Sequence, residues 1–213
     1  HDGVDVVAPG DDDDLDVGVV RADVLEDLLP LKIGHRQVEQ DEADVLLFED
    51  ALETIGWSPE DVDMIIHTHL HNDHCENDVL CTNAKVYVQQ AELDFFHNPH
   101  PIDHRYYPDV LDDVQVETVH GDSTIVEGID VLFSPGHTAG GQSVVVNTAK
   151  GKAVITGLCC NAENFPAGGG VIAPGVHLDV IQAYESMKRI REIADIIIPL
   201  HDLAVGKKST IPE

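Results

Sequence analysis

Apolar positions predict a helix, a turn and a strand in the first third of the chain. Over residues 42–55 the apolar side chains recur at steps of three and four, which predicts an amphipathic helix that stops at Gly56. Residues 58–61 read as a capped single turn, and the apolar run 62–67 has the length of a short strand. The chain therefore enters its most polar segment, residues 68–74, directly from a strand.

The rest of the chain alternates short strands with helices. We expect strands at 85–89, 114–119, 125–134, 143–148, 153–156 and 195–200, a short helix at 91–96 and a longer one at 179–194. Hairpins of strands with helices between them are typical of a layered α/β sandwich. Such a fold brings residues that follow strand ends to one sheet edge, where a site can form.

Residues 1–42 differ from the rest of the chain. They are rich in aspartate and weakly periodic, with one predicted short helix at 20–29 that ends at Pro30. The block of four aspartates at 11–14 is typical of a solvated acidic segment. We therefore predict an acidic N-terminal arm or excursion at 1–42 and a single domain at 43–213.

The charge balance excludes one class of partner. Forty acidic residues against 12 basic ones leave a formal charge of −28, and such a surface repels phosphate backbones. We therefore expect no nucleic-acid partner. Acidic residues spread over the whole chain are typical of proteins from salt-loving microbes, where concentrated salt screens the self-repulsion.

The cysteines and the hydropathy indicate a cytoplasmic protein. The four cysteines show no paired C-x-x-C spacing, so neither a zinc finger nor a disulfide framework is predicted. No apolar run approaches the roughly 20 residues of a membrane helix, and the N-terminus lacks the order of a signal peptide. We expect no membrane partner, and a homodimer is left open.

The segment after the predicted strand at 62–67 carries a metal-ligand pattern. His69, His71, Asp73 and His74 put three imidazoles and one carboxylate within six residues. A chain of this composition would show that pattern by chance only about 0.006 times. Alternation along an extended loop sends His69 and His71 to the same side, which leaves Asp73 and His74 to serve a second position.

Two more histidines follow predicted strands far along the chain. His137 comes just after the strand at 125–134, in a segment rich in glycine, and His201 comes just after the strand at 195–200. Either would be an ordinary histidine if it stood alone. Together with the first cluster and at strand ends, both become candidate metal ligands.

The H-x-H-x-D-H run, the later S-P-G-H-T-x-G-G segment and the strand that ends in histidine resemble the metallo-β-lactamase superfamily, from about residue 42 onward. Residues 162–165 most resemble its N-acyl-homoserine lactonase group. The resemblance implies an αββα sandwich and two divalent metal ions, zinc first and iron or manganese as alternatives. It also implies the ligands: His69, His71 and His137 for the first metal, and Asp73, His74 and His201 for the second.

The chain departs from that family at three points. Leu158 stands where a metal-bridging aspartate is expected, so either Cys159 supplies a thiolate ligand or the second site is weak and Cys159 is a small buried apolar residue. Asn161 stands where the lactonase group tends to carry a tyrosine, and its amide can still donate to an oxyanion. The N-terminus is also shorter than the family implies, so we expect the first strands to be missing from this sequence.

The expected reaction is hydrolysis of a small-molecule lactone or related ester. A metal-bound hydroxide would attack the carbonyl, with Asp73 orienting or deprotonating the water and later protonating the leaving alkoxide. One alternative is a thioester hydrolase of the glyoxalase II type, which would normally keep the bridging aspartate and show basic residues for its anionic substrate. Another alternative is a catalytically silent metal-binding module of the same fold.

Overall fold

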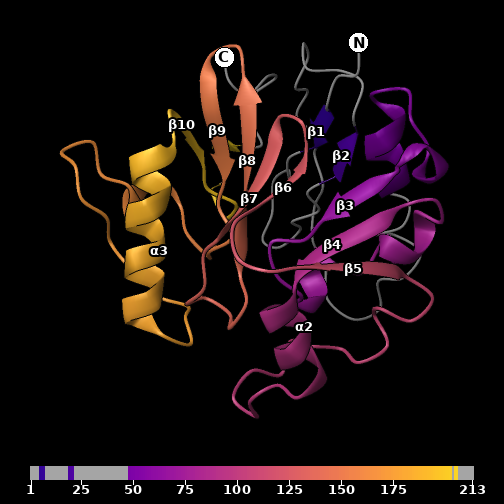
Figure 1. The fold of residues 1–213 in the computed structure, drawn as a ribbon, viewed down its shortest axis with the longest axis horizontal. Helices are drawn as coiled ribbons and strands as arrows, with labels where there is room; N and C mark the ends of the chain where they lie inside the picture. The colour runs from indigo at the N-terminus through magenta and orange to yellow at the C-terminus, as the bar shows by residue number, and fades with distance from the viewer. Residues whose placement is uncertain (1–4, 8–18, 22–47, 203, 206–213) are drawn as a thin grey trace.

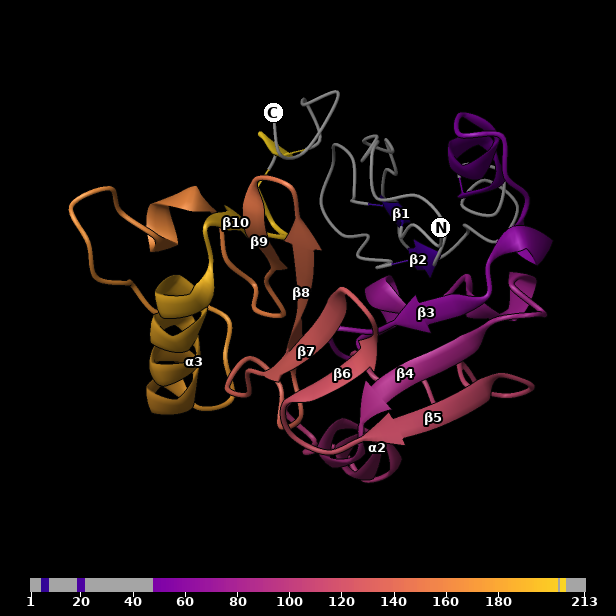
Figure 2. The same ribbon diagram turned by 45° about the horizontal axis from the view of Figure 1, so that its top comes forward.

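Two five-stranded sheets face each other, and helices cover their outer faces. The computed structural model describes residues 5–7, 19–21, 48–202 and 204–205. Figures 1 and 2 show the two sheets side by side, with the longest helix on the far side of one of them. This is the αββα arrangement that the family resemblance implies.

The first sheet joins antiparallel and parallel strands. In spatial order it contains β1 (Asp5–Val7), β2 (Val19–Arg21), β3 (Met64–Ile66), β4 (Lys85–Gln89) and β5 (Gln115–Val119). β1, β2 and β3 pair antiparallel, whereas β3, β4 and β5 run parallel. The parallel pairs place the segments after β3 and β4 at the same end of the sheet.

The second sheet is mostly antiparallel. Its spatial order is β10 (Ile196–Ile198), β9 (Gly151–Ile155), β8 (Gln142–Thr148), β7 (Ile129–Phe133) and β6 (Ser123–Val126). β10 runs parallel to β9, and the other neighbours pair antiparallel. The loop between β7 and β8 and the segment after β10 carry the two distant histidines, His137 and His201.

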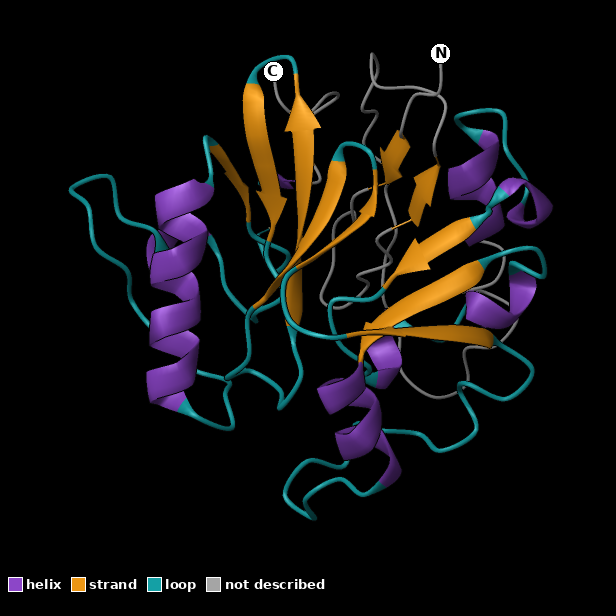
Figure 3. Ribbon diagram, viewed as in Figure 1, coloured by secondary structure: helices purple, strands orange, loops and turns teal. Residues whose placement is uncertain are grey.

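Among the described residues, the α-helices at residues 48–53, α2 (Gln90–His97) and α3 (Val180–Ile193) lie outside the sheets (Figure 3). Asp179 begins α3 by accepting hydrogen bonds from the backbone N–H groups of Ile181 and Gln182, which would otherwise lack partners. In the part of the chain that the structure describes, every helix is too short or too polar to span a membrane.

The core follows from the alternation of side chains along the strands. In β8, Val144 and Val146 belong to the cluster between the two sheets, while Val145 packs on the other face against Met187 of α3. On the outer face of the first sheet, Phe48 packs against Ile65 of β3. Four layers therefore share three apolar interfaces.

Most of the predicted elements that the structure describes are confirmed, and two are wrong. The strand predicted at 125–134 is a hairpin, because Gly128 adopts a φ of 91° and turns the chain between β6 and β7. Residues 19–21, which overlap the helix predicted at 20–29, form β2 and pair with β3. The remainder of that helix and the acidic block at 11–14 lie outside the described residues, and the boundary at residue 42 stays a prediction.

Candidate metal centre

The loop after β3 carries three buried histidines and one partly exposed carboxylate. His69, His71 and His74 are each 1% exposed, and the Asp73 side chain is 18% exposed. The backbone is extended at His71 and then tightens into a 3₁₀ turn over Asn72–His74. This turn brings the His74 ring back to the His69 ring, with 3.9 Å between the ring centroids.

The loop between β7 and β8 brings His137 to the same place. Gly136, just before it, has a φ of 127°, and a Cβ atom there would lie 2.1 Å from the backbone nitrogen of Ala183. Only glycine therefore lets this loop pass against the start of α3. The backbone N–H of Leu178, just before α3, donates to the carbonyl of Gly136 at 2.8 Å and also holds the loop against the start of this helix.

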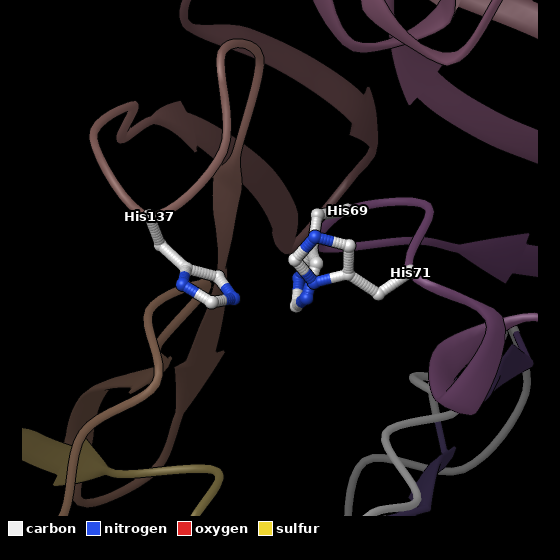
Figure 4. Close-up of side chains that lie close together, drawn as sticks. All are labelled: His69, His71 and His137. Carbon is white, nitrogen blue, oxygen red and sulfur yellow. The ribbon is translucent and has the colours of Figure 1, made fainter. Parts of the chain in front are cut away.

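The side chains of His69, His71 and His137 point toward one shared space (Figure 4). One ring nitrogen from each lies within 4.8 Å of the others, and all three residues are buried. The His69 ring centroid is 4.6 Å from that of His71 and 4.7 Å from that of His137. The predicted first set of ligands is thus brought together, although His137 lies far along the chain from His69 and His71.

Each of these three histidines has one ring nitrogen held by a neighbour. The contacts are His69 Nδ1 with Thr68 Oγ1 at 3.0 Å, His71 Nε2 with Asp103 Oδ2 at 3.0 Å, and His137 Nδ1 with the Val176 carbonyl at 3.0 Å. Such contacts orient metal-ligating imidazoles and leave the second nitrogen for the ion. The second nitrogen of His69, Nε2, is buried and has no hydrogen-bond partner.

The electrostatics keep the three imidazoles neutral. Burial lowers the pKa of His69 well below its usual value, and the neighbouring histidines lower it further. Burial also lowers the pKa of His71, although Asp103 opposes part of that effect, and burial and His71 lower the pKa of His137 to about 3. Neutral imidazole is the form that binds metal.

Asp73, His74 and His201 surround this cluster. Asp73 Oδ2 lies 3.3 Å from His74 Nε2, and the ring centroids of His74 and His201 are 6.0 Å apart. Burial alone would raise the pKa of Asp73, but His74 and His71 outweigh it and hold the pKa below its usual value. Asp73 Oδ1 is buried without a hydrogen-bond partner. The assignment of these residues to a second metal stays a prediction.

The segment after β9 lies next to His201. The backbone N–H of His201 donates to the carbonyl of Cys160 at 3.2 Å. Leu158 is buried in the cluster that packs under α3, Cys159 is half-buried, and Asn161 is exposed. The roles expected of Cys159 and Asn161 stay predictions.

The donor set fits a divalent metal ion. Three neutral imidazole nitrogens, one of them buried without a partner, are ligands that zinc, iron, manganese and cobalt accept. Asp73 and His74 add oxygen and nitrogen donors directly beside them. An apolar filling of the same space would leave the buried Nε2 of His69 unsatisfied, at a cost of about 1–3 kcal/mol.

The sequence analysis did not identify Asp103 and Glu92, two residues that support the centre. Asp103 lies in a loop without periodicity or motif, yet its carboxylate meets His71. Glu92 lies in the short helix predicted at 91–96, to which the sequence analysis gave no role, yet it is fully buried and contacts both histidine loops. The one available signal was a glutamate among apolar positions of a short helix.

Comparisons with known proteins agree with this geometry. The metallo-beta-lactamase superfamily model matches residues 35–157. An N-acyl homoserine lactonase from Bacillus sp. is 30% identical over 145 residues, which cover 67% of this chain and 55% of the relative. A probable metallo-hydrolase from Methanocaldococcus jannaschii is 29% identical over 160 residues, which cover 75% of this chain and 66% of the relative.

Solved structures show the same similarity. An N-acyl homoserine lactone hydrolase with the product N-hexanoyl-L-homoserine at its catalytic metal centre superposes with a TM-score of 0.63 at 26% identity, covering 78% of this chain and 66% of that one. The chain spans about 55% of the length of the first curated relatives it matches. The family match covers more than half of the chain, and the fold and the histidine cluster agree with it: this chain belongs to the metallo-beta-lactamase superfamily.

Proposed function

We propose that this protein is a metal-dependent hydrolase that opens a lactone, with N-acyl-homoserine lactones as the first substrate class to test. The observation that carries the proposal is the buried cluster of His69, His71 and His137, each with one ring nitrogen oriented by a neighbour. The relatives and structural neighbours that are named as lactonases support the choice of substrate.

Asp73 is the residue placed to manage the proton. A bound divalent metal would supply a water of lowered pKa and polarise the carbonyl of the ester. The lowered pKa of Asp73 keeps its carboxylate ionised, so it can accept a hydrogen bond from the attacking water and orient it. Its side chain is 18% exposed, which leaves it accessible from solution. Asp73 would take a proton from that water as it attacks the carbonyl carbon, and would deliver the same proton to the alkoxide oxygen that leaves when the C–O bond of the lactone ring breaks.

Asn161 is the proposed donor to the developing oxyanion. Its side-chain oxygen accepts a hydrogen bond from the backbone N–H of Glu163 at 3.0 Å, which caps the 3₁₀ turn Ala162–Asn164. The amide oxygen is therefore engaged, and the amide NH₂ is the group left to donate. An amide N–H can take the part that a phenol plays in related lactonases, with the difference that it transfers no proton.

The charge of the chain favours a neutral substrate. A net charge of −28 opposes the approach of a polyanionic thioester, whereas a neutral lactone feels little of this field. Binding of the substrate would then rest on apolar contacts and on the polarised carbonyl. Among hydrolysable acyl compounds, the charge therefore favours uncharged esters, and the names of the relatives direct the choice among these to lactones.

The test is a metal-loaded assay with two substrates. Protein purified without added metal is loaded with zinc, manganese or cobalt, and hydrolysis of N-hexanoyl-homoserine lactone and of an anionic glutathione thioester is followed by proton release. The proposal expects turnover of the lactone at least tenfold above that of the thioester. Faster thioester hydrolysis would favour the glyoxalase II type, and full metal loading without turnover of either would indicate a silent metal-binding module.

A further inference from the structure

Glu92 is a fully buried carboxylate that receives three hydrogen bonds. It lies in the first turn of α2. Its Oε1 atom accepts from the backbone N–H of Leu70 at 3.0 Å and from the hydroxyl of Tyr106 at 2.8 Å, and its Oε2 atom accepts from the backbone N–H of Gly140 at 2.9 Å. Burial of a carboxylate is costly unless such donors replace water, so this arrangement fixes the side chain firmly.

The two backbone donors belong to the two loops that carry the histidines. Leu70 stands between His69 and His71, and Gly140 follows His137 by three residues in the loop between β7 and β8. One carboxylate therefore joins loops that come from different sheets. In each loop, the backbone N–H group that donates to Glu92 belongs to a residue one to three positions from a candidate metal ligand.

The contact between Gly140 and α2 is close enough to exclude any side chain. A Cβ atom on Gly140 would lie 2.0 Å from the backbone nitrogen of Glu92. The loop that carries His137 thus rests directly on the first turn of α2, and the carboxylate bridges from there to the loop after β3. A shift of α2 would move both loops.

The third hydrogen bond reaches the same centre. The Tyr106 ring meets the His71 ring edge to face, with 4.9 Å between the centroids. Its hydroxyl donates to Glu92, so Tyr106 connects the carboxylate of Glu92 to the His71 ring. Each of the three partners of Glu92 therefore either belongs to a loop that carries one of the three histidines or packs against a histidine ring.

We propose that Glu92 is a positioning residue that sets the distances between the ring nitrogens of His69, His71 and His137 by tying their two loops to α2. This inference rests on the proposed metal centre but not on the substrate. Glu92 does not touch the ion. It acts through the backbone at Leu70 and Gly140, and its loss should loosen the site while leaving every ligand in the sequence.

Glu92→Gln tests the proposal with almost no change in shape. An amide has only one acceptor oxygen, so its NH₂ group would face at least one of the N–H donors that the carboxylate satisfies. With Co²⁺ as the probe, we expect the dissociation constant to rise by at least tenfold and the visible d–d absorption band to change, because outer contacts of this kind tune affinity by about 10–100-fold. Glu185→Gln, the same change on an exposed side chain of α3, should leave both unchanged.

Two further variants separate positioning from folding. Tyr106→Phe removes only the hydroxyl arm, and we expect a smaller loss of Co²⁺ affinity than Glu92→Gln causes. Glu92→Asp keeps the charge with a shorter reach, and we expect an intermediate affinity in a folded protein, as judged by circular dichroism after chelation.

The outcomes are distinct. Parent affinity and an unchanged spectrum in Glu92→Gln would overturn the proposal, and so would loss of folding in both Glu92 variants, which would assign the residue to the stability of the fold. A parent protein that binds Co²⁺ but hydrolyses no lactone would refute the proposed function and leave this test intact. A parent that binds no Co²⁺ would refute both.

Discussion

Asp103 Oδ2 lies 3.0 Å from Nε2 of His71, and both side chains are 1% exposed. Arg105 holds the same carboxylate from the other side, through Nε at 3.0 Å and a second guanidinium nitrogen at 3.1 Å. The Asp103 pKa is held below its usual value, because His71 and Arg105 outweigh the effect of burial. An ionised Asp103 requires a proton on Nε2 of His71, which leaves Nδ1 to face the metal position.

Removal of the Asp103 carboxylate should weaken metal binding without removing a ligand. In Asp103→Ala the His71 ring loses the partner that fixes its tautomer and orientation, and we expect about a 10–100-fold loss of metal affinity. Competition against a chromogenic chelator measures it. Asp94→Ala, a change of the same type on the exposed face of α2, serves as the control. Equal affinities in the two variants would exclude a role for Asp103 in orienting His71.

The three histidines of the cluster could be predicted from sequence, whereas the side chains that hold them in place could not. The spacing of His69 and His71 identifies them as candidate ligands, and the glycine-rich loop after a strand identifies His137. Both signals are local in the sequence. The contacts of Asp103 and Glu92 arise only when segments far apart in sequence pack together, here over separations of 32 residues for His71 and 48 residues for Gly140. No pattern along the chain encodes such a contact.

The same distinction explains the errors in the fold. Runs of apolar residues predicted strand positions well, but periodicity alone did not separate β6 from β7, where a single residue, Gly128, makes the turn. Residues 20 and 21 were predicted to begin a helix, but Val19–Arg21 form a strand that pairs with β1 and β3. Tertiary pairing therefore overrode local propensity.

His71→Ala should abolish hydrolysis and leave the protein folded. The variant removes one of the three imidazoles of the first site, while Asp103 keeps its contact with Arg105 and does not become an isolated buried charge. We expect kcat/KM to fall by at least about 1,000-fold and the free energy of unfolding by no more than about 1–3 kcal/mol. His97→Ala, at an exposed position, should retain parent activity. Near-normal turnover with unchanged metal content would remove His71 from the site.

Gly136→Ala should be among the most destabilising single changes. The added Cβ would meet the Ala183 backbone at 2.1 Å, and the φ of 127° is itself unfavourable for alanine. We expect a loss of about 2–4 kcal/mol in the free energy of unfolding, measured by urea titration. Gly121→Ala is the matched control, because its φ of 67° is also positive but nothing lies within 4 Å, so it should cost only about 1 kcal/mol. Similar costs for the two variants would contradict the proposed close packing against α3.

Stability should rise with salt concentration. A net charge of −28 on 213 residues produces self-repulsion, and counterions screen it over a Debye length that falls from about 10 Å at 0.1 M to about 3 Å at 1 M. Exposed ion pairs such as Lys85 with Glu117 contribute little to stability. The stability lost when salt screens these pairs is therefore smaller than the stability gained when it screens the repulsion between carboxylates. We expect Tm to increase steadily between low salt and molar KCl, and not in sucrose of equal osmolality. A flat or falling Tm in KCl would exclude the halophilic interpretation.

The last prediction concerns Cys159, which lies next to the position where the family places a bridging carboxylate. Leu158 is 1% exposed and packed beneath α3, so it supplies no ligand. Cys159 is half-buried, and the next residue, Cys160, accepts a backbone hydrogen bond from His201. If the Cys159 sulfur takes part in the second site, bound metal should keep it as a thiolate and protect it from alkylation, and chelation should expose it.

Substitution separates this ligand role from simple packing. Cys159→Ser replaces a soft ligand with a hydroxyl and should lower the metal-to-protein ratio, whereas Cys159→Asp should restore a family-like carboxylate and raise it. Cys81→Ser, a change of the same chemistry at a buried thiol in the core cluster that contains Phe48, controls for general damage to the fold. A side chain that only fills space would instead leave the ratio unchanged in Cys159→Ser and alkylate at the same rate with or without metal. The ratio, measured by elemental analysis on identically prepared proteins, therefore decides whether the sulfur binds the second ion.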